Sequence, residues 1–301
     1  MNRAVEQLLD IRSEDGGFGP YPGSDSRTEA SAVAALALLR AGGPDAAERA
    51  AAAIGWLEAR QLASGAWPLG PGQDTPHWST SLAVLALAYA ETGDPAALAV
   101  GARWLLEEEG RGQPWWVSVL YRLFPERRNV ALDANLIGWP WASGTFSWVE
   151  PTSYALLALK RVPAADADRA AARISEAEGL LADRACVGGG WNYGNRTVLG
   201  EDLWPYPDTT AAALFALADR ADLPEVAAAL DVLPEMALET GSILALGMAA
   251  LALAMHGRDA NALRERLDEA LAAWESGEIR ALAWAALGLA DTPNPLEIPV
   301  G

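Results

Sequence analysis

The sequence predicts an all-α protein in which six inner helices form a ring and six outer helices surround it, an (α/α)6 barrel. Two kinds of helical segment alternate along the 301 residues, one amphipathic and one apolar on nearly all sides. Loops that combine glycine with an aromatic residue recur before the apolar segments, which is typical of a repeat architecture. An apolar helix needs cover on every side, so we expect the apolar set inside and the amphipathic set outside.

The boundaries follow from the apolar period and from Gly, Pro and Asp signals at the ends of the segments. We expect outer helices at 2–11, 45–61, 96–109, 166–183, 223–230 and 259–274. We expect inner helices at 28–41, 79–90, 151–162, 208–218, 240–255 and 278–289. The whole chain, 1–301, is then one domain, with a short helical insertion at about 111–138 and a Pro-rich tail at 292–301.

The loops predict where the function lies. Connections from an inner helix to the next outer helix are short, whereas four of the connections back to an inner helix are long and rich in Gly and Trp. All the long loops must therefore lie over the N-termini of the inner helices, at the end that we call the mouth. Binding and catalytic residues are often carried by loops on a rigid scaffold, so we expect them at the mouth.

Composition excludes several classes of function. The net charge of −18 disfavours binding to nucleic acid or to an anionic membrane, because both require Lys and Arg to displace counterions. Cys186 is the only cysteine, so an intramolecular disulfide is impossible and a reducing compartment, the cytoplasm, is expected. The longest apolar run, 242–255, is too short to cross a bilayer. Peripheral membrane contact and the oligomeric state stay open.

Gln61, Gly65 and Trp67 match the Gln-Trp repeat, and by these residues the chain resembles squalene-hopene cyclases. The glycine-aromatic loops and the Ala- and Leu-rich helices after them are similar to the wider group that includes protein prenyltransferase β-subunits. The resemblance implies a barrel that binds an isoprenoid-like small molecule. The zinc ligands of the prenyltransferases have no match here, because Cys186 precedes a glycine loop and the histidines are only His77 and His256. We expect no metal and no cofactor.

The resemblance also implies a proton donor. Aligned on its Thr-Ala pair, the acidic motif of the cyclases corresponds to residues 206–211, and its middle aspartate is Asp208. The residues alone allow a different interpretation, in which Asp208 caps the N-terminus of the inner helix. Glu150 and Asp133 are the next candidates. Acidic residues recur at the starts of inner helices, and carboxyl groups crowded around one opening raise the pKa of at least one of them.

Aromatic residues near the long loops predict a pocket lining. Trp67 and Trp191 occupy the fixed position of the repeat and are expected to hold neighbouring helix pairs together. Other aromatic side chains can hold a flat isoprenoid or stabilise a carbocation with their ring faces. The substrate-binding candidates are Trp78, Trp139, Trp141, Trp204 and Tyr206, together with His77, which is placed to orient an acid.

Three functions are consistent with these observations. The first is a class II type cyclisation of an isoprenoid or meroterpenoid, started by protonation, and it predicts a deep apolar cavity with a carboxyl group at its inner end. The second is a non-catalytic isoprenoid or lipid binder, or an interaction scaffold, and it predicts a shallow or filled barrel. The third is a carbohydrate-active enzyme with paired carboxylates, against which the Gln-Trp pattern counts. We favour the first.

Overall fold

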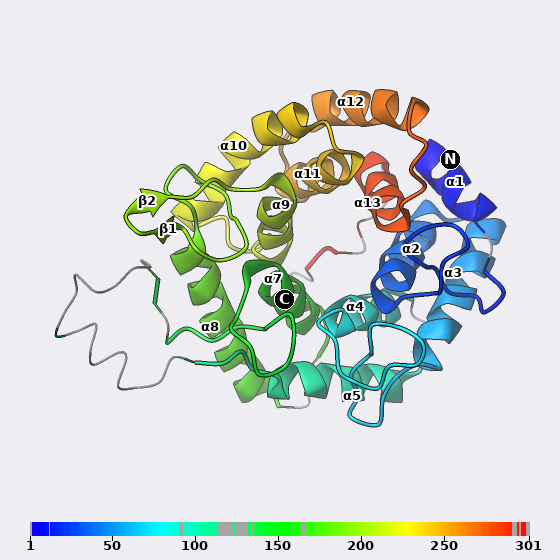
Figure 1. Cartoon of the computed structure of the whole chain (residues 1–301), viewed down its shortest axis with the longest axis horizontal. Helices are drawn as coiled ribbons and strands as arrows, with labels where there is room; N and C mark the ends of the chain where they lie inside the picture. Colours follow the sequence, from blue (N-terminus) through cyan, green and yellow to red (C-terminus); the bar gives the residue numbers. More distant parts are fainter. Residues whose placement is uncertain are drawn as a thin grey trace.

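The structure, a computed structural model, describes residues 2–11, 13–90, 93–112, 123, 132–133, 135–163, 166–290, 294 and 296–298. Within these ranges the chain forms twelve helices and one hairpin of two short strands. The helices lie in two concentric rings, so the predicted (α/α)6 barrel is confirmed (Figure 1). Most of the predicted insertion at 111–138 lies outside the described residues.

Apolar helices form the inner ring, and they are α2 (Thr28–Ala41), α4 (Thr80–Ala90), α7 (Val149–Arg161), α9 (Pro207–Ala216), α11 (Ile243–Met255) and α13 (Ile279–Leu289). Each inner helix contacts the next one, and α13 contacts α2, which closes the ring. Small residues allow the closest of these contacts. A Cβ atom on Gly288 would lie 2.4 Å from the carbonyl oxygen of Gly247, so α13 and α11 approach through bare backbone.

Amphipathic helices form the outer ring, and they are α1 (Arg3–Asp10), α3 (Pro44–Glu58), α5 (Pro95–Glu107), α8 (Ala167–Arg184), α10 (Pro224–Thr240) and α12 (Asn261–Ala272). Helix α10 differs from the prediction because it does not stop at residue 230 but continues through Pro234. A proline inside a helix costs about 3 kcal/mol. Leu233 and Ala237 are fully buried, and their packing against the core offsets this cost. The following inner helix therefore begins at Ile243 rather than at residue 240.

Three loop tryptophans join the two rings, and we call Trp67, Trp139 and Trp191 the anchor tryptophans. The indole N–H of Trp67 donates to the Leu57 carbonyl on outer helix α3 at 2.7 Å, and its backbone N–H donates to the Thr80 hydroxyl on inner helix α4 at 2.9 Å. Trp139 donates in the same way to the Leu105 carbonyl at 2.9 Å and to the Thr152 hydroxyl at 3.0 Å. Trp191 donates to the Leu181 carbonyl at 2.6 Å and to the Thr210 hydroxyl at 2.9 Å. Each anchor thus fixes the end of one outer helix to the start of the next inner helix.

Gln61 supplies the other half of the Gln-Trp repeat. Its side-chain amide donates to the Gly65 carbonyl and to the Ala97 carbonyl, both at 2.8 Å. The first bond closes the loop, and the second ties the loop to α5 of the next repeat.

Among the helices of the described ranges, none combines the length and the apolar character that crossing a membrane requires.

Candidate active site

The second residue of an inner helix faces the barrel axis at the mouth. Glu29, Glu150 and Asp208 hold this position in α2, α7 and α9, and Arg280 holds it in α13. Each of the three acids also lies two residues before a Ser or Thr whose hydroxyl accepts a backbone N–H from the preceding loop. In α4 that hydroxyl belongs to Thr80, and the residue two positions before it is Trp78. Because the inner helices run in the same direction, these five residues meet around one opening, and we call them the mouth cluster.

Arg280 holds two carboxylates from two other helices. Its Nε lies 3.1 Å from Oε1 of Glu29, and its Nη2 donates to Oε1 of Glu150 at 2.9 Å. The Glu150 side chain is only 5% exposed, whereas those of Glu29 and Arg280 are 22% and 25% exposed. Asp208 adds a third carboxylate that interacts electrostatically with this group. The mouth cluster therefore carries more negative than positive charge.

Glu150 is the carboxyl group whose chemistry this environment changes most. Burial raises the pKa of Glu150 from 4.5 to about 7. The positive charge of Arg280 opposes this shift, and the negative charges of Glu29 and Asp208 add to it. Burial also raises the pKa of Glu29. Near neutral pH, Glu150 therefore exchanges between its acid and its base forms, which suits a group that gives and takes a proton.

An aromatic layer lies directly below the mouth cluster. Tyr154, one helical turn after Glu150, stacks against Trp78 at a centroid distance of 6.0 Å and against Trp284 at 6.1 Å. Phe215 stacks on the other side of Trp284 at 5.4 Å. The Tyr154 hydroxyl is buried and has no hydrogen-bond partner among the described residues. Burial raises the pKa of Tyr154, so the hydroxyl stays neutral.

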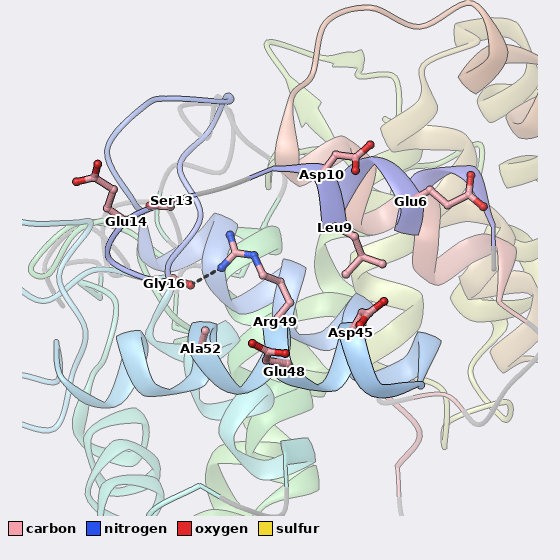
Figure 2. Close-up of a pocket in the computed structure, with 10 residues that line it drawn as sticks. All are labelled: Glu6, Leu9, Asp10, Ser13, Glu14, Gly16, Asp45, Glu48, Arg49 and Ala52. Carbon is pink, nitrogen blue, oxygen red and sulfur yellow. Dashed lines mark hydrogen bonds between the residues drawn. The ribbon is translucent and has the colours of Figure 1, made fainter.

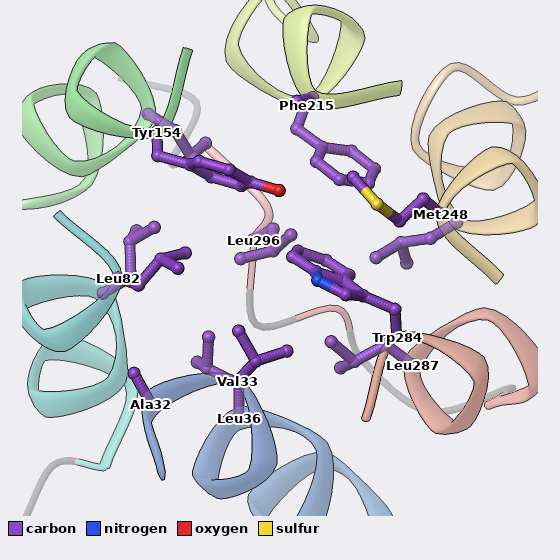
Figure 3. Packing of buried hydrophobic residues seen from close by; sticks show 14 of the residues in the cluster. Ala32, Val33, Leu36, Leu82, Tyr154, Phe215, Met248, Trp284, Leu287 and Leu296 are labelled. Atoms are coloured by element: carbon purple, nitrogen blue, oxygen red, sulfur yellow. The ribbon is translucent and has the colours of Figure 1, made fainter. Parts of the chain in front are cut away.

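The interior at the level of this layer is filled by side chains (Figure 3). Val33, Leu82, Tyr154, Trp284 and Leu296 are each at most 1% exposed. Space for a water molecule beside these side chains would appear as exposed surface, so these five side chains are closely packed against their neighbours. The deep apolar cavity that the cyclase hypothesis predicts is not open in this structure, for the described residues.

The structure places Asp208 in the first turn of α9 and half buried. Pro207 begins this helix, and the N-cap is Tyr206, so the interpretation of Asp208 as the capping residue is wrong. Asp133, by contrast, is exposed beside the end of α8. Its backbone N–H donates to the Asp183 carboxylate at 2.9 Å, and its carbonyl accepts from Arg184 at 3.1 Å. The structure brings Asp208, but not Asp133, to Glu150.

The predicted substrate-binding residues divide into three groups. The rings of Trp78 and Trp141 meet edge to face with their centroids 4.8 Å apart. Trp78 is part of the aromatic layer below the mouth, so this pair lies where a molecule entering the mouth would make contact. Trp139 is 2% exposed and is an anchor tryptophan, not a residue of the mouth. Trp204 and Tyr206 lie on the exposed rim, 84% and 46% exposed.

His77 lies between the Trp67 loop and α4. Its Nδ1 is 2.9 Å from the Ser79 hydroxyl, and its ring lies 5.7 Å from that of Trp78. Burial lowers the pKa of His77 to about 4, so the ring is neutral at physiological pH. The described contacts of His77 are with its own loop and do not reach Glu150.

The prediction from sequence missed Arg280, Tyr154 and Trp284, although a signal for them exists. The spacing i, i+4, i+7 from the second residue of an inner helix follows the face that points to the axis. On α7 this face carries Glu150, Tyr154 and Leu157, and on α13 it carries Arg280, Trp284 and Leu287. The aromatic layer is therefore encoded one turn below the mouth cluster.

A second concave surface lies on the outer ring, between α1 and α3 (Figure 2). It is a groove of about 620 Å³ lined mainly by acidic side chains, those of Glu6, Asp10, Glu14, Asp45 and Glu48. Arg49 points from α3 to the loop above, where it donates to the Gly16 carbonyl at 3.2 Å. This arginine orders the loop.

Comparison with known proteins adds information on the fold. No protein-family model matches this sequence, and a search of curated proteins finds no relative. Among solved structures, the type II terpene cyclase MstE from Scytonema is similar, with a TM-score of 0.56 and 17% identity over 90% of this chain and 75% of the cyclase. The chain has the fold of a type II terpene cyclase. Variants of that cyclase have also been solved with geranylgeranyl dihydroxybenzoate as substrate and with merosterolic acid A as product.

Other proteins share this terpene-cyclase-like fold. A protein from Actinoplanes matches with a TM-score of 0.61 and 17% identity, over 95% of this chain and 96% of the other. A sugar epimerase from a ruminal bacterium matches with a TM-score of 0.55 and 14% identity, over 89% and 85% of the two chains. One architecture thus serves different chemistries, so the function has to be argued from the mouth cluster and the aromatic layer.

Proposed function

We propose that this protein is a terpene-cyclase-like enzyme in which Glu150 protonates an isoprenoid or meroterpenoid chain and so starts a class II type cyclisation. One observation carries the proposal: a buried carboxyl group with a pKa of about 7 lies directly above three stacked aromatic rings. Arg280 supports this role because its guanidinium stabilises the carboxylate that remains after the proton has left.

The proposed step balances without a cofactor. The electron pair of an alkene forms a C–H bond with the Glu150 proton, and a carbocation remains on the other alkene carbon. A second alkene of the same chain attacks this cation and closes a ring. Loss of a proton from the cyclic cation gives an isomer of the substrate, and a proton from solvent restores the Glu150 carboxyl. The faces of Trp78, Tyr154 and Trp284 stabilise the passing positive charge.

In this proposal Asp208 is not the proton donor but the neighbour that keeps Glu150 protonated. Its negative charge raises the pKa of Glu150, and so does that of Glu29. The choice of a meroterpenoid or isoprenoid substrate is supported by the substrate of the structurally similar cyclase. The charged mouth cluster fits the polar head of such a molecule, and the aromatic layer fits its chain.

A second candidate function is supported by the filled interior. Side chains at most 1% exposed occupy the axis, as expected for a protein that kept the barrel and binds an isoprenoid or lipid without converting it, or that serves as an interaction scaffold. The two candidates differ in whether a bound chain is converted.

The test is incubation of the purified protein with geranylgeraniol and with geranylgeranyl dihydroxybenzoate, followed by mass spectrometry for cyclic isomers. Glu150→Gln should lower product formation roughly a hundredfold or more, since general acid catalysis contributes at least that much. Asp208→Asn should lower it less, and Asp133→Asn should leave it unchanged. Full activity of Glu150→Gln would disprove the role of Glu150. Binding without any product from either substrate would favour the second candidate.

A further inference from the structure

The two ends of the barrel are closed in different ways. At the mouth, Arg280 on α13 is bound to carboxylates of α2 and α7, so ion pairs link three inner helices. At the opposite end, Leu296 lies among the side chains of the inner ring (Figure 3). Leu296 is completely buried, although none of the described tail residues, 294 and 296–298, lies in a helix or a strand.

Few polar contacts of the described residues hold this part of the tail. The Arg161 side chain, at the last residue of α7, donates to the Glu297 carbonyl at 2.7 Å. Asn294 forms a local turn, in which its side chain accepts from the Leu296 N–H at 2.9 Å and its carbonyl accepts from the Glu297 N–H at 3.1 Å. Ile298 packs only partly against the core. The burial of Leu296 is therefore the main contact between the described tail residues and the barrel.

The Tyr154 hydroxyl points toward the centre of the ring, and in the same view Leu296 also lies at the centre (Figure 3). It is buried and lacks a hydrogen-bond partner among the described residues. Natural proteins leave few buried polar atoms unpaired, because an unpaired hydroxyl loses its hydrogen bonds to water and gains none in return. An isobutyl side chain cannot supply the missing bond, whereas a ligand with a hydroxyl or carbonyl group can.

We propose that Leu296 is an internal plug that occupies the place of a ligand, and that the barrel binds an apolar molecule bearing one hydroxyl or carbonyl group when Leu296 withdraws. The branched apolar side chain of leucine resembles one isoprene unit in size and shape, so the ligand class is an isoprenoid alcohol or ketone. The ligand enters at the end away from the mouth, and its oxygen bonds to the Tyr154 hydroxyl. The inference rests on the proposed function only in that the barrel admits an apolar chain, and it does not require turnover.

The test uses the full chain and measures the affinity for farnesol by equilibrium dialysis. Leu296→Asp should expel the tail residue from the apolar interior, because a carboxylate cannot be buried there without a partner. Leu238→Asp, at a 40% exposed leucine on outer helix α10, introduces the same charge outside the barrel and serves as the control. Leu296→Ala is the second variant. It shortens the side chain but keeps the tail apolar, and it is used if Leu296→Asp loses its helical circular dichroism.

We expect Leu296→Asp to bind farnesol roughly tenfold or more tightly than the unaltered protein, because removing a closed state that predominates raises the competent fraction by that factor. Leu238→Asp should bind like the unaltered protein, and Leu296→Ala should be intermediate. Equal affinities of Leu296→Asp and Leu238→Asp, both with native circular dichroism, would overturn the plug. If Leu296→Asp does not fold, equal affinities of Leu296→Ala and the unaltered protein would do so.

The role of the hydroxyl is tested by adding Tyr154→Phe to Leu296→Ala. The Leu296→Ala protein should prefer farnesol over the hydrocarbon farnesene, and loss of the hydroxyl should lower that preference by roughly 2- to 10-fold, the range for one net hydrogen bond. An unchanged preference would disprove the contact with Tyr154. The outcomes also separate this inference from the proposed function. Tighter farnesol binding without cyclic products would support the plug and reject the cyclase, whereas cyclic products without tighter binding would do the reverse.

Discussion

The anchor tryptophans and the residues that face the axis come from the same repeat, but they differ in how well their polar groups are satisfied. Every anchor tryptophan donates both its indole N–H and its backbone N–H to a protein acceptor. Along the axis, Tyr154 has a buried hydroxyl without a described partner, and Glu150 is a buried acid beside two further carboxylates. The hydrogen bonds of the anchor tryptophans stabilise the wall of the barrel. The axis instead keeps a buried hydroxyl without a described partner and crowded carboxyl groups, which cost stability and are typical of functional sites.

The largest expected effect tests the wall. Trp191→Ala removes a fully buried indole and its hydrogen bond to the Leu181 carbonyl, and it should lower the free energy of unfolding by about 3–5 kcal/mol, measured by urea denaturation and circular dichroism. Trp204→Ala removes an indole that is 84% exposed on the rim, and it should change stability by at most about 0.5 kcal/mol. Similar losses in both variants would mean that the anchor position has no special structural role.

Arg280→Met tests whether the mouth cluster depends on its cation. The substitution leaves the buried Glu150 and the half-buried Glu29 without a counter-charge, so stability at pH 8 should fall by about 3–5 kcal/mol. At pH 5 the loss should be smaller, because Glu150 then holds a proton. The control is Arg258→Met, which removes an exposed ion pair to Asp231 and should cost at most about 1 kcal/mol. An equal loss at pH 5 and pH 8 would contradict the charge explanation.

Glu150→Gln tests the raised pKa directly. A carboxyl group with a raised pKa keeps its proton in the folded state while the unfolded state loses it, so the stability that it contributes is lost as the pH rises from 4.5 to about 7. Glutamine does not titrate. The variant should therefore become more stable than the unaltered protein by about 1–3 kcal/mol above pH 7, with little difference below pH 4.5. A stability difference that stays constant with pH would show that Glu150 titrates normally.

The smallest expected effect concerns the aromatic layer. Tyr154→Phe removes a hydroxyl that makes no described hydrogen bond, so thermal unfolding should show a gain in stability of up to about 1 kcal/mol. Tyr21→Phe, at a tyrosine that is 52% exposed, should change nothing measurable. A clear loss of stability in Tyr154→Phe would place that hydroxyl among the structural groups and remove the contrast between wall and axis.

The local sequence was sufficient for the two rings and for the end of the barrel at which the long loops lie. The apolar and amphipathic periods are properties of each segment, so they indicate which helix is inner, and the long loops indicate which end is the mouth. The same local logic failed at Pro234 and at Trp139. In α10 the burial of Leu233 and Ala237 offsets a proline that locally signals a stop. At the third repeat Trp139 and Trp141 lie two residues apart in one loop, and only the hydrogen bonds of Trp139 to Thr152 and Leu105 identify it as the anchor.

By itself the sequence determined a closed double ring of helices and a carboxyl-rich, aromatic mouth. Both follow from apolar periodicity and loop length, which depend only on residues close together in the sequence. Only the tertiary structure decided that Arg280 meets Glu150, 130 positions earlier in the chain, and that Leu296 fills the far end of the barrel. Ring closure brings the first residues of distant helices to one axis. Which charges then pair, and which pKa moves, depends on burial and distance that no local pattern contains.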